Sequence, residues 1–308
     1  MSVRENAAKA LCMVLPSLKA HLETGDSPVI LGLTGVQGSG KSTWAAAIVD
    51  ELRETYHYNA LSVSLDDFYY TRRKLDELRE VNPENALLRT RGVPGTHDKL
   101  LVQSFLSSLR AKQGALSVPS FDKSAYGGQG DRRPVEQWVQ LIGAVDILVF
   151  EGWCVGFTPI TSEEIDDRRR QATDEKPKIS NQSFASTLIQ YNLDHLNDLN
   201  NRLRWYCEVF MGPQHFHALT QLDTACVDVV YRWRLQQERS MVQQVGHGMR
   251  DEAVVAFIQS YMPAYELYLD QVREGFFRQD RVQDVSNKAH VRVILGEHRE
   301  VVDMGMLR

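Results

Sequence analysis

The sequence PVILGLTGVQGSGKS, residues 28–42, contains a short apolar run that leads directly into a glycine-rich segment. The apolar run, residues 28–33, has the length and continuous hydrophobicity of a strand buried on both faces of a parallel sheet. Residues 35–42 match the pattern G-x-x-x-x-G-K-[ST] without deviation, and helical periodicity follows over residues 44–52. This order of strand, glycine loop and helix predicts a phosphate-binding loop, in which backbone N–H groups and a helix N-terminus surround an anion.

The phosphate loop, residues 35–42, predicts a site for ATP and Mg²⁺. In such a loop the lysine, Lys41, reaches the β- and γ-phosphates, and the hydroxyl of Ser42 binds Mg²⁺. The residues expected to contact the nucleotide are Gly35, Val36, Gln37, Gly38, Ser39, Gly40, Lys41, Ser42 and Thr43.

Two further strand-like segments end in acidic residues. The segment 60–65 is followed by Asp66 and Asp67, and the apolar segment 146–150 is followed by Glu151. An acid at the first position can accept the proton of an attacking hydroxyl, and we expect Asp66 to do so. Aspartate also caps helices and turns, so the choice between Asp66 and Asp67 stays open at this stage. Glu151 is expected to bind Mg²⁺, directly or through water.

The remaining pattern predicts strands that alternate with helices, and hence a mostly parallel sheet covered on both faces. Further strands are expected at residues 217–222, 291–295 and 300–302. Helices are expected in the N-terminal segment and at residues 97–110, 193–210, 231–239 and 251–269, the last interrupted near Pro263. Residues 120–134 are expected to form a loop. We expect one domain over residues 1–308, with an exposed charged insertion at about residues 161–183.

Composition excludes several classes of protein. The chain has 308 residues, 43% of them hydrophobic and 24% charged, which excludes fibrous and wholly disordered chains. Its net charge of −5 argues against nucleic-acid binding. None of the four cysteines lies in a C-x-x-C pair, which favours free thiols in a reducing compartment. A membrane span would need a run of about 18 apolar residues, and the sequence contains none. The expected location is cytoplasmic.

Several motifs together resemble the D-glycerate 3-kinase family, which belongs with the uridine kinase, pantothenate kinase and phosphoribulokinase group. The resemblance covers roughly residues 30–269, and RGVPGTHD and FDKSAYGGQGDR are its most discriminating motifs. It implies an α/β fold, the three-layer sandwich of the P-loop NTPases with a mostly parallel central sheet. The motifs are GLTGVQGSGKST (32–43), SLDDFYYT (64–71), RGVPGTHD (91–98), FDKSAYGGQGDR (121–132), VFEGW (149–153) and VVYRWRLQQE (229–238).

The resemblance also implies roles for individual residues. Asp66 is the implied base, Glu151 the acid beside the nucleotide, and Arg234, or alternatively Arg232, the lid residue over the phosphates. Residues expected around the acceptor are Asp67, Tyr69, Arg91, His97, Asp98, Asp122, Lys123 and Arg132. The cations among them suit an acceptor that carries a carboxylate, because the arginine fork binds both oxygens of such a group.

These observations predict an ATP-dependent small-molecule kinase that phosphorylates a hydroxyl of a small hydroxy acid, D-glycerate first, to give 3-phosphoglycerate. Within the same class, the alternative acceptor is a nucleoside, a pantothenate-like molecule or another small alcohol. A nucleotide-dependent switch or ATPase without a small acceptor is the alternative from another class. The residues indicate neither the acceptor by themselves nor the oligomeric state.

Overall fold

The computed structural model describes residues 1–25, 27–111, 115–174, 186–246, 248–278 and 286–307. Its centre is a sheet of six strands in the order β10-β9-β8-β1-β7-β2. The strands are β1 (Val29–Gly35), β2 (Ala60–Ser64), β7 (Ile147–Gly152), β8 (Ala218–Thr224), β9 (Ala289–Leu295) and β10 (Val301–Leu307). Every neighbouring pair is parallel except β9 and β10. The expected mostly parallel α/β sheet is therefore confirmed.

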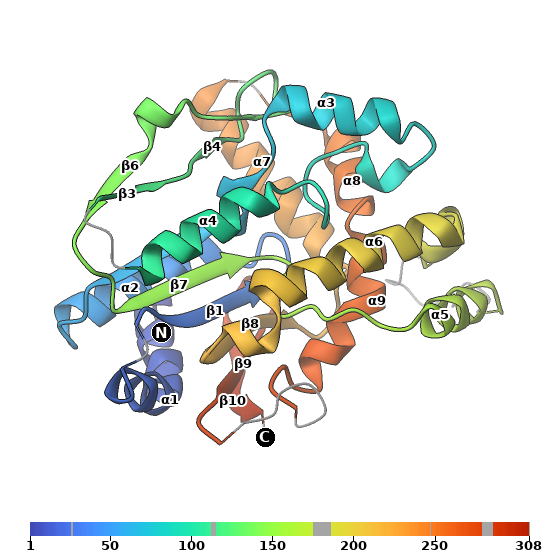
Figure 1. Ribbon diagram of the computed structural model, residues 1–308. Coiled ribbons are helices and arrows are strands. Elements are labelled where there is room, and N and C mark those ends of the chain that lie inside the picture. Colours follow the sequence, from blue (N-terminus) through green and yellow to red (C-terminus); the bar gives the residue numbers. More distant parts are fainter. Residues whose placement is uncertain (26, 112–114, 175–185, 247, 279–285, 308) are drawn as a thin grey trace.

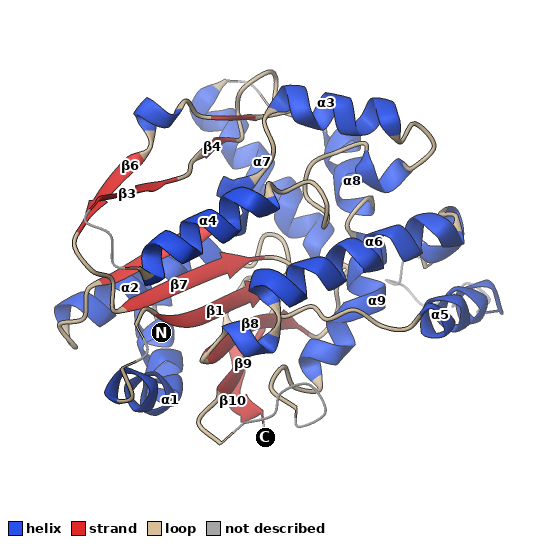
Figure 2. Cartoon of the chain, viewed as in Figure 1, coloured by secondary structure: helices blue, strands red, loops and turns tan. Residues whose placement is uncertain are grey.

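Helices cover both faces of this sheet (Figures 1 and 2). On one face α1 and α2 pack against each other and against the sheet, and α4 and α6 lie across the other face. The helices are α1 (Val3–Glu23), α2 (Lys41–Glu54), α3 (Arg72–Val81), α4 (Lys99–Arg110), α5 (Ser162–Asp174), α6 (Leu193–Tyr206), α7 (Val229–Val245), α8 (Asp251–Gln259) and α9 (Met262–Arg273). The layers agree with the expected three-layer sandwich.

Local sequence explains the main features of these elements. All residues of β1 and β7 are buried, in keeping with their apolar runs 29–33 and 147–150; Thr34 and Glu151 follow these runs and are buried as well. Gly32 lets β8 approach β1, because a Cβ at this position would lie 2.7 Å from the side chain of Leu219. Pro263 lies in the first turn of α9, where its missing N–H costs nothing, so the helical segment 251–269 is divided into α8 and α9.

The structure differs from the sequence-based expectations in three places. Residues 162–174 of the charged segment form α5, which is mostly exposed but buries Ile165; residues 175–185 lie outside the described part. The segment 120–134 contains the short paired strands β4 (Phe121–Asp122) and β5 (Asp131–Arg132). Three further elements were not predicted: α3, and the antiparallel pair β3 (Ala115–Val118) and β6 (Val139–Ile142).

The parallel topology brings the ends of three strands to one edge of the sheet. In the sheet β7 lies between β1 and β2, with Glu151 beside both Leu33 and Ser64. The chain turns from β1 into the phosphate loop, from β2 into the segment with Asp66, and from β7 into Trp153. Among the described residues no helix is long and apolar enough to cross a membrane, and the cytoplasmic location stays a prediction.

Candidate active site

The phosphate loop connects β1 to α2 by a backbone path that needs glycine. Gly38 and Gly40 have φ of 79° and 89°, in the left-handed region that other residues rarely adopt. Gly38 also lies against α7, since a Cβ would come within 2.6 Å of the Cβ of Trp233. The backbone of the loop and the start of α2 thus lie together, in the arrangement expected of an anion cradle.

Ser42 and Glu151 meet beside this cradle. The hydroxyl of Ser42 donates a hydrogen bond of 3.0 Å to Oε1 of Glu151, whose side chain is buried at the end of β7. Lys41 Nζ donates to the carbonyl oxygens of Gly35 and Val36, at 2.9 and 3.3 Å. Burial lowers the pKa of Lys41, and the carboxylates of Glu151 and Asp66 oppose that shift. Lys41 and Glu151 therefore both lie beside the loop.

Asp66 lies next to these groups at the end of β2. Its Oδ2 is 2.5 Å from Nζ of Lys123, and its Oδ1 accepts a hydrogen bond of 2.9 Å from the hydroxyl of Tyr69. Burial raises the pKa of Asp66, but the charge and hydrogen bond of Lys123 outweigh this and hold the pKa far below its usual range. The Asp66 charge in turn raises the pKa of Lys123. Both groups are therefore ionised at neutral pH.

Asp67 is placed differently from its neighbour. Its Oδ1 accepts a hydrogen bond of 3.2 Å from the backbone N–H of Phe121, the first residue of β4. Burial, with a further contribution from the Asp66 charge, raises the pKa of Asp67 to about 6. The two acids therefore differ in their surroundings. The charge of Asp66 interacts with Lys41 and Lys123, whereas Asp67 supports the segment that carries Lys123.

His97 lies beside Asp66 in a buried aromatic group. Its ring stacks on that of Tyr69, with the ring centroids 4.4 Å apart, and its Nδ1 is 3.1 Å from the hydroxyl of Tyr206. Burial lowers the pKa of His97 to about 4, so the imidazole is neutral. Tyr206, the last residue of α6, had no signal in the sequence.

The other residues that were predicted to surround the acceptor mainly join loops to one another. Arg91 donates to the carbonyl oxygens of Gly128, at 2.7 Å, and Gln129. Arg132 donates to the carbonyl of Tyr69 and forms an ion pair of 3.0 Å with Asp98, which also caps α4.

Asp122 closes its own turn by accepting from the backbone N–H and the hydroxyl of Ser124. These two hydrogen bonds lower the pKa of Asp122. Lys123 is thus the cation from this set that lies directly at Asp66.

Arg234 lies on α7 and is paired with an acid of the same helix. Its guanidinium is paired at 2.9 Å with the buried carboxylate of Glu238, and Arg232 is paired with Glu297 at the surface. The backbone of α7, rather than these side chains, touches the phosphate loop at Gly38. No contact in the described residues decides which arginine serves as the lid residue.

Several contacts of the loop come from residues that sequence reasoning missed. The Gln37 N–H donates to the hydroxyl of Tyr265, and the Arg91 carbonyl accepts from the hydroxyl of Tyr261, one helical turn earlier. Arg299, in the turn between β9 and β10, donates to the Gly38 carbonyl at 2.6 Å. Tyr261 and Tyr265 are four residues apart, a spacing that places both on one face of a helix, which was the available signal.

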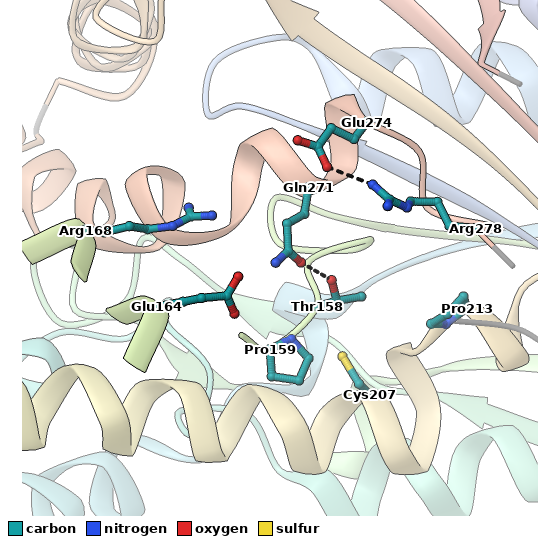
Figure 3. Close-up of a pocket in the computed structure, with 9 residues that line it drawn as sticks. All are labelled: Thr158, Pro159, Glu164, Arg168, Cys207, Pro213, Gln271, Glu274 and Arg278. Atoms are coloured by element: carbon teal, nitrogen blue, oxygen red, sulfur yellow. Dashed lines mark hydrogen bonds and ion pairs between the residues drawn. The ribbon is translucent and has the colours of Figure 1, made fainter. Parts of the chain in front are cut away.

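A separate cavity of about 560 Å³ lies between α5 and α9, next to the C-terminal end of α6 (Figure 3). It contains none of the predicted site residues. Polar residues of its wall are paired with each other: Thr158 donates a hydrogen bond to Gln271, and Glu274 forms an ion pair with Arg278. The candidate active site is therefore the strand edge with the phosphate loop, and not this cavity.

The sheet, its phosphate loop and the acids at the same edge are those of a P-loop phosphotransferase. A scan against protein-family models gave no match. The chain is 35% identical to "Uncharacterized kinase mug58" of Schizosaccharomyces pombe, over 94% of this chain and 96% of that protein. It is 35% identical to "D-glycerate 3-kinase, chloroplastic" of Arabidopsis thaliana, over 79% of this chain and 48% of that protein.

Among solved structures, D-glycerate 3-kinase from Cryptococcus neoformans superimposes with a TM-score of 0.82 and 29% identity, over 99% of this chain and 98% of that one. The chain belongs to the D-glycerate 3-kinase family, and it is an ATP-dependent phosphotransferase. Kinases of this family use ATP together with a divalent metal ion.

Proposed function

We propose that this kinase transfers the γ-phosphoryl group of ATP to a hydroxyl of D-glycerate and forms 3-phosphoglycerate. The observation that carries the proposal is the Asp66–Lys123 pair beside Lys41 and Glu151. A carboxylate for the attacking hydroxyl and an ammonium for an acidic acceptor lie side by side, at the edge where the nucleotide phosphates bind. The names of two relatives support the same acceptor.

On the nucleotide side, residues 35–43 surround the phosphates with backbone N–H groups, and Lys41 neutralises charge on the β- and γ-phosphates. This places positive charge where negative charge develops in the transition state. Arg234, or alternatively Arg232, contributes a second cation after its guanidinium leaves its present partner, Glu238 or Glu297.

Ser42 and Glu151 fit a Mg²⁺ ion, because both present oxygen atoms and lie 3.0 Å from each other. In the described residues no three His, Cys, Asp or Glu side chains gather into a metal site. Two protein oxygens suit Mg²⁺, which commonly takes its other ligands from water and phosphate. When bound, the ion draws charge from the phosphate oxygens.

On the acceptor side, Asp66 accepts the proton of the attacking hydroxyl, and the Tyr69 hydroxyl orients its carboxylate. Lys123 pairs with the carboxylate of the acceptor. Because Lys123 holds the pKa of Asp66 down, its turn toward the acceptor leaves Asp66 a stronger base. Asp67, Arg91, Asp98, Asp122 and Arg132 hold the loops around this pocket.

The test is steady-state kinetics with ATP, Mg²⁺ and a panel of D-glycerate, glycerol, uridine and pantothenate, with ³¹P NMR to locate the phosphate in the product. Glycerol is the matched control because it lacks only the carboxylate. We expect kcat/KM for D-glycerate to exceed that for glycerol by more than about 10²-fold, since glycerol leaves Lys123 without its partner. Equal efficiency on the two would remove the carboxylate pocket, and preference for uridine or pantothenate would replace D-glycerate as the acceptor.

A further inference from the structure

The hydroxyl of Tyr206 connects three polar atoms of the segment 95–97. It accepts hydrogen bonds from the backbone N–H groups of Gly95, at 2.8 Å, and His97, at 3.2 Å. The same oxygen lies 3.1 Å from Nδ1 of the His97 ring. Tyr206 is 2% exposed, so its hydroxyl is shielded from solvent.

The proton count at this hydroxyl decides the form of the His97 ring. The phenol oxygen already accepts two N–H groups and has one proton to donate. The atom left to receive that proton is Nδ1 of His97, which must then carry a lone pair. In a neutral imidazole the proton is consequently on Nε2.

Nε2 of His97 is buried and has no hydrogen-bond partner among the described residues. The residue is 1% exposed, and a buried N–H without a partner is costly. The His97 ring stacks on Tyr69, whose hydroxyl donates to Asp66, and the Asp66 charge acts on the imidazole. The unpartnered donor thus belongs to a ring that stacks on Tyr69 and on which the Asp66 charge acts.

We propose that Tyr206 is a positioning residue that holds His97 as the Nε2–H tautomer, so that His97 donates one hydrogen bond to an oxygen of the acceptor. The acceptor part of this inference rests on the proposed function. An alcohol or carboxylate oxygen supplies the missing partner of Nε2. Burial, which holds the pKa of His97 near 4, keeps the ring neutral in the working range of pH.

The first test reads the tautomer directly in the 308-residue chain without ligand. The chain has nine histidines, so ¹⁵N-histidine NMR spectra of the wild type and His97→Gln would assign the His97 signals by their loss. We expect a protonated Nε2 and an unprotonated Nδ1 in the wild type. In Tyr206→Phe we expect Nδ1–H to become populated, because the donor to Nδ1 is gone. An Nδ1–H ring in the wild type would overturn the proposal.

The second test uses kinetics with a matched tyrosine. Tyr268 is also fully buried, but its hydroxyl has no hydrogen-bond partner in the described part of the chain, so Tyr268→Phe controls for loss of a buried phenol oxygen. We expect Tyr206→Phe to raise the KM for the acceptor about tenfold and to leave the KM for ATP unchanged. Equal effects of the two variants on the KM for the acceptor would contradict the positioning role.

A third pair of variants separates the donor from the ring. The amide nitrogen of glutamine lies near the place of Nε2, whereas that of asparagine lies near Nδ1. We therefore expect His97→Gln to retain more acceptor affinity than His97→Asn, and the reverse order would count against an Nε2 donor. Failure of every acceptor in the panel would refute the proposed function alone, because the NMR test needs no acceptor.

Discussion

Lys41 is the residue of the proposed site whose substitution we expect to reduce activity most directly. Its removal takes a cation from the β- and γ-phosphates, where charge develops during transfer. We expect Lys41→Ala and Lys41→Met to lower kcat by on the order of 10²-fold or more at saturating ATP. The exposed Lys74 of α3, paired with Glu77 at the surface, offers a control, and Lys74→Ala should retain activity. Near-normal turnover of both Lys41 variants would contradict the assignment of the phosphate loop.

The two adjacent acids should differ in their effect on catalysis. Asp66→Asn preserves shape but cannot accept a proton, and we expect kcat to fall by about 10²–10⁴-fold. Asp67→Asn should cost less, because the amide oxygen can still accept from the Phe121 N–H. The measurement is kcat for both variants with ATP held at saturation. A larger loss in Asp67→Asn would reverse our assignment of the base.

Asp67 should also leave a mark on stability. Its folded pKa of about 6 lies above the ordinary value of 3.8, so the folded state binds the proton more tightly. The tighter proton binding adds to the free energy of unfolding below about pH 4, and this stabilisation is lost as the pH rises to about 6. The loss is on the order of 2 kcal/mol.

Asp67→Asn removes this dependence, so its unfolding free energy relative to wild type should increase from pH 4 to pH 7. Urea unfolding at several pH values measures the difference, with the exposed Asp50→Asn of α2 as control. A relative stability that stays flat, or falls, across this range would show that Asp67 is not buried in the protonated form.

At the scale of elements, Arg91 joins two loops rather than ending in open space. Its guanidinium donates to the Gly128 and Gln129 carbonyls, and its own carbonyl accepts from Tyr261. We expect Arg91→Ala to loosen the segment 121–132 and to reduce activity on D-glycerate and glycerol by similar factors of about tenfold. Kinetics on both acceptors and hydrogen exchange of this segment test the expectation.

Arg133 is the matched control for this change. It directly follows that segment and pairs with Asp122 at the surface, so Arg133→Ala should leave both activities within about twofold. If Arg91→Ala instead affected D-glycerate alone, Arg91 would contact the acceptor carboxylate itself.

At the scale of the whole molecule, the C-terminal hairpin of β9 and β10 supports the phosphate loop near the N-terminus. Arg299 donates to the carbonyl oxygens of Gly38 and Trp233, so the turn between β9 and β10 ties the phosphate loop to α7. We expect Arg299→Ala to raise the KM for ATP several-fold, with little change in the KM for the acceptor. Arg4→Ala, which loses only a surface ion pair with Glu54, is the control. An unchanged KM for ATP would show that the loop keeps its shape without this contact.

Much of the fold and of the nucleotide side of the site follows from local sequence. The apolar runs of β1 and β7, the glycines of the phosphate loop and the break at Pro263 depend on steric and hydrophobic preferences of neighbouring residues. The motifs after β1, β2 and β7 also lie where parallel strands end, so their meeting at one edge could be anticipated.

The acceptor side could not be predicted in the same way. Whether Arg91 and Arg132 face a ligand or a backbone carbonyl depends on where the segments 91–98 and 121–132 meet, and no local preference encodes that meeting. The same holds for Tyr206, which lies 109 residues from its partner His97, and for Arg299, which lies 261 residues from Gly38. The sequence alone determined the type of fold and the phosphate loop, because both arise from short-range periodicity and backbone freedom. Only the tertiary structure decided which charged side chains are paired and that Nε2 of His97 lacks a hydrogen-bond partner among the described residues. The reason is that hydrogen bonds between distant segments exist only once the chain has packed.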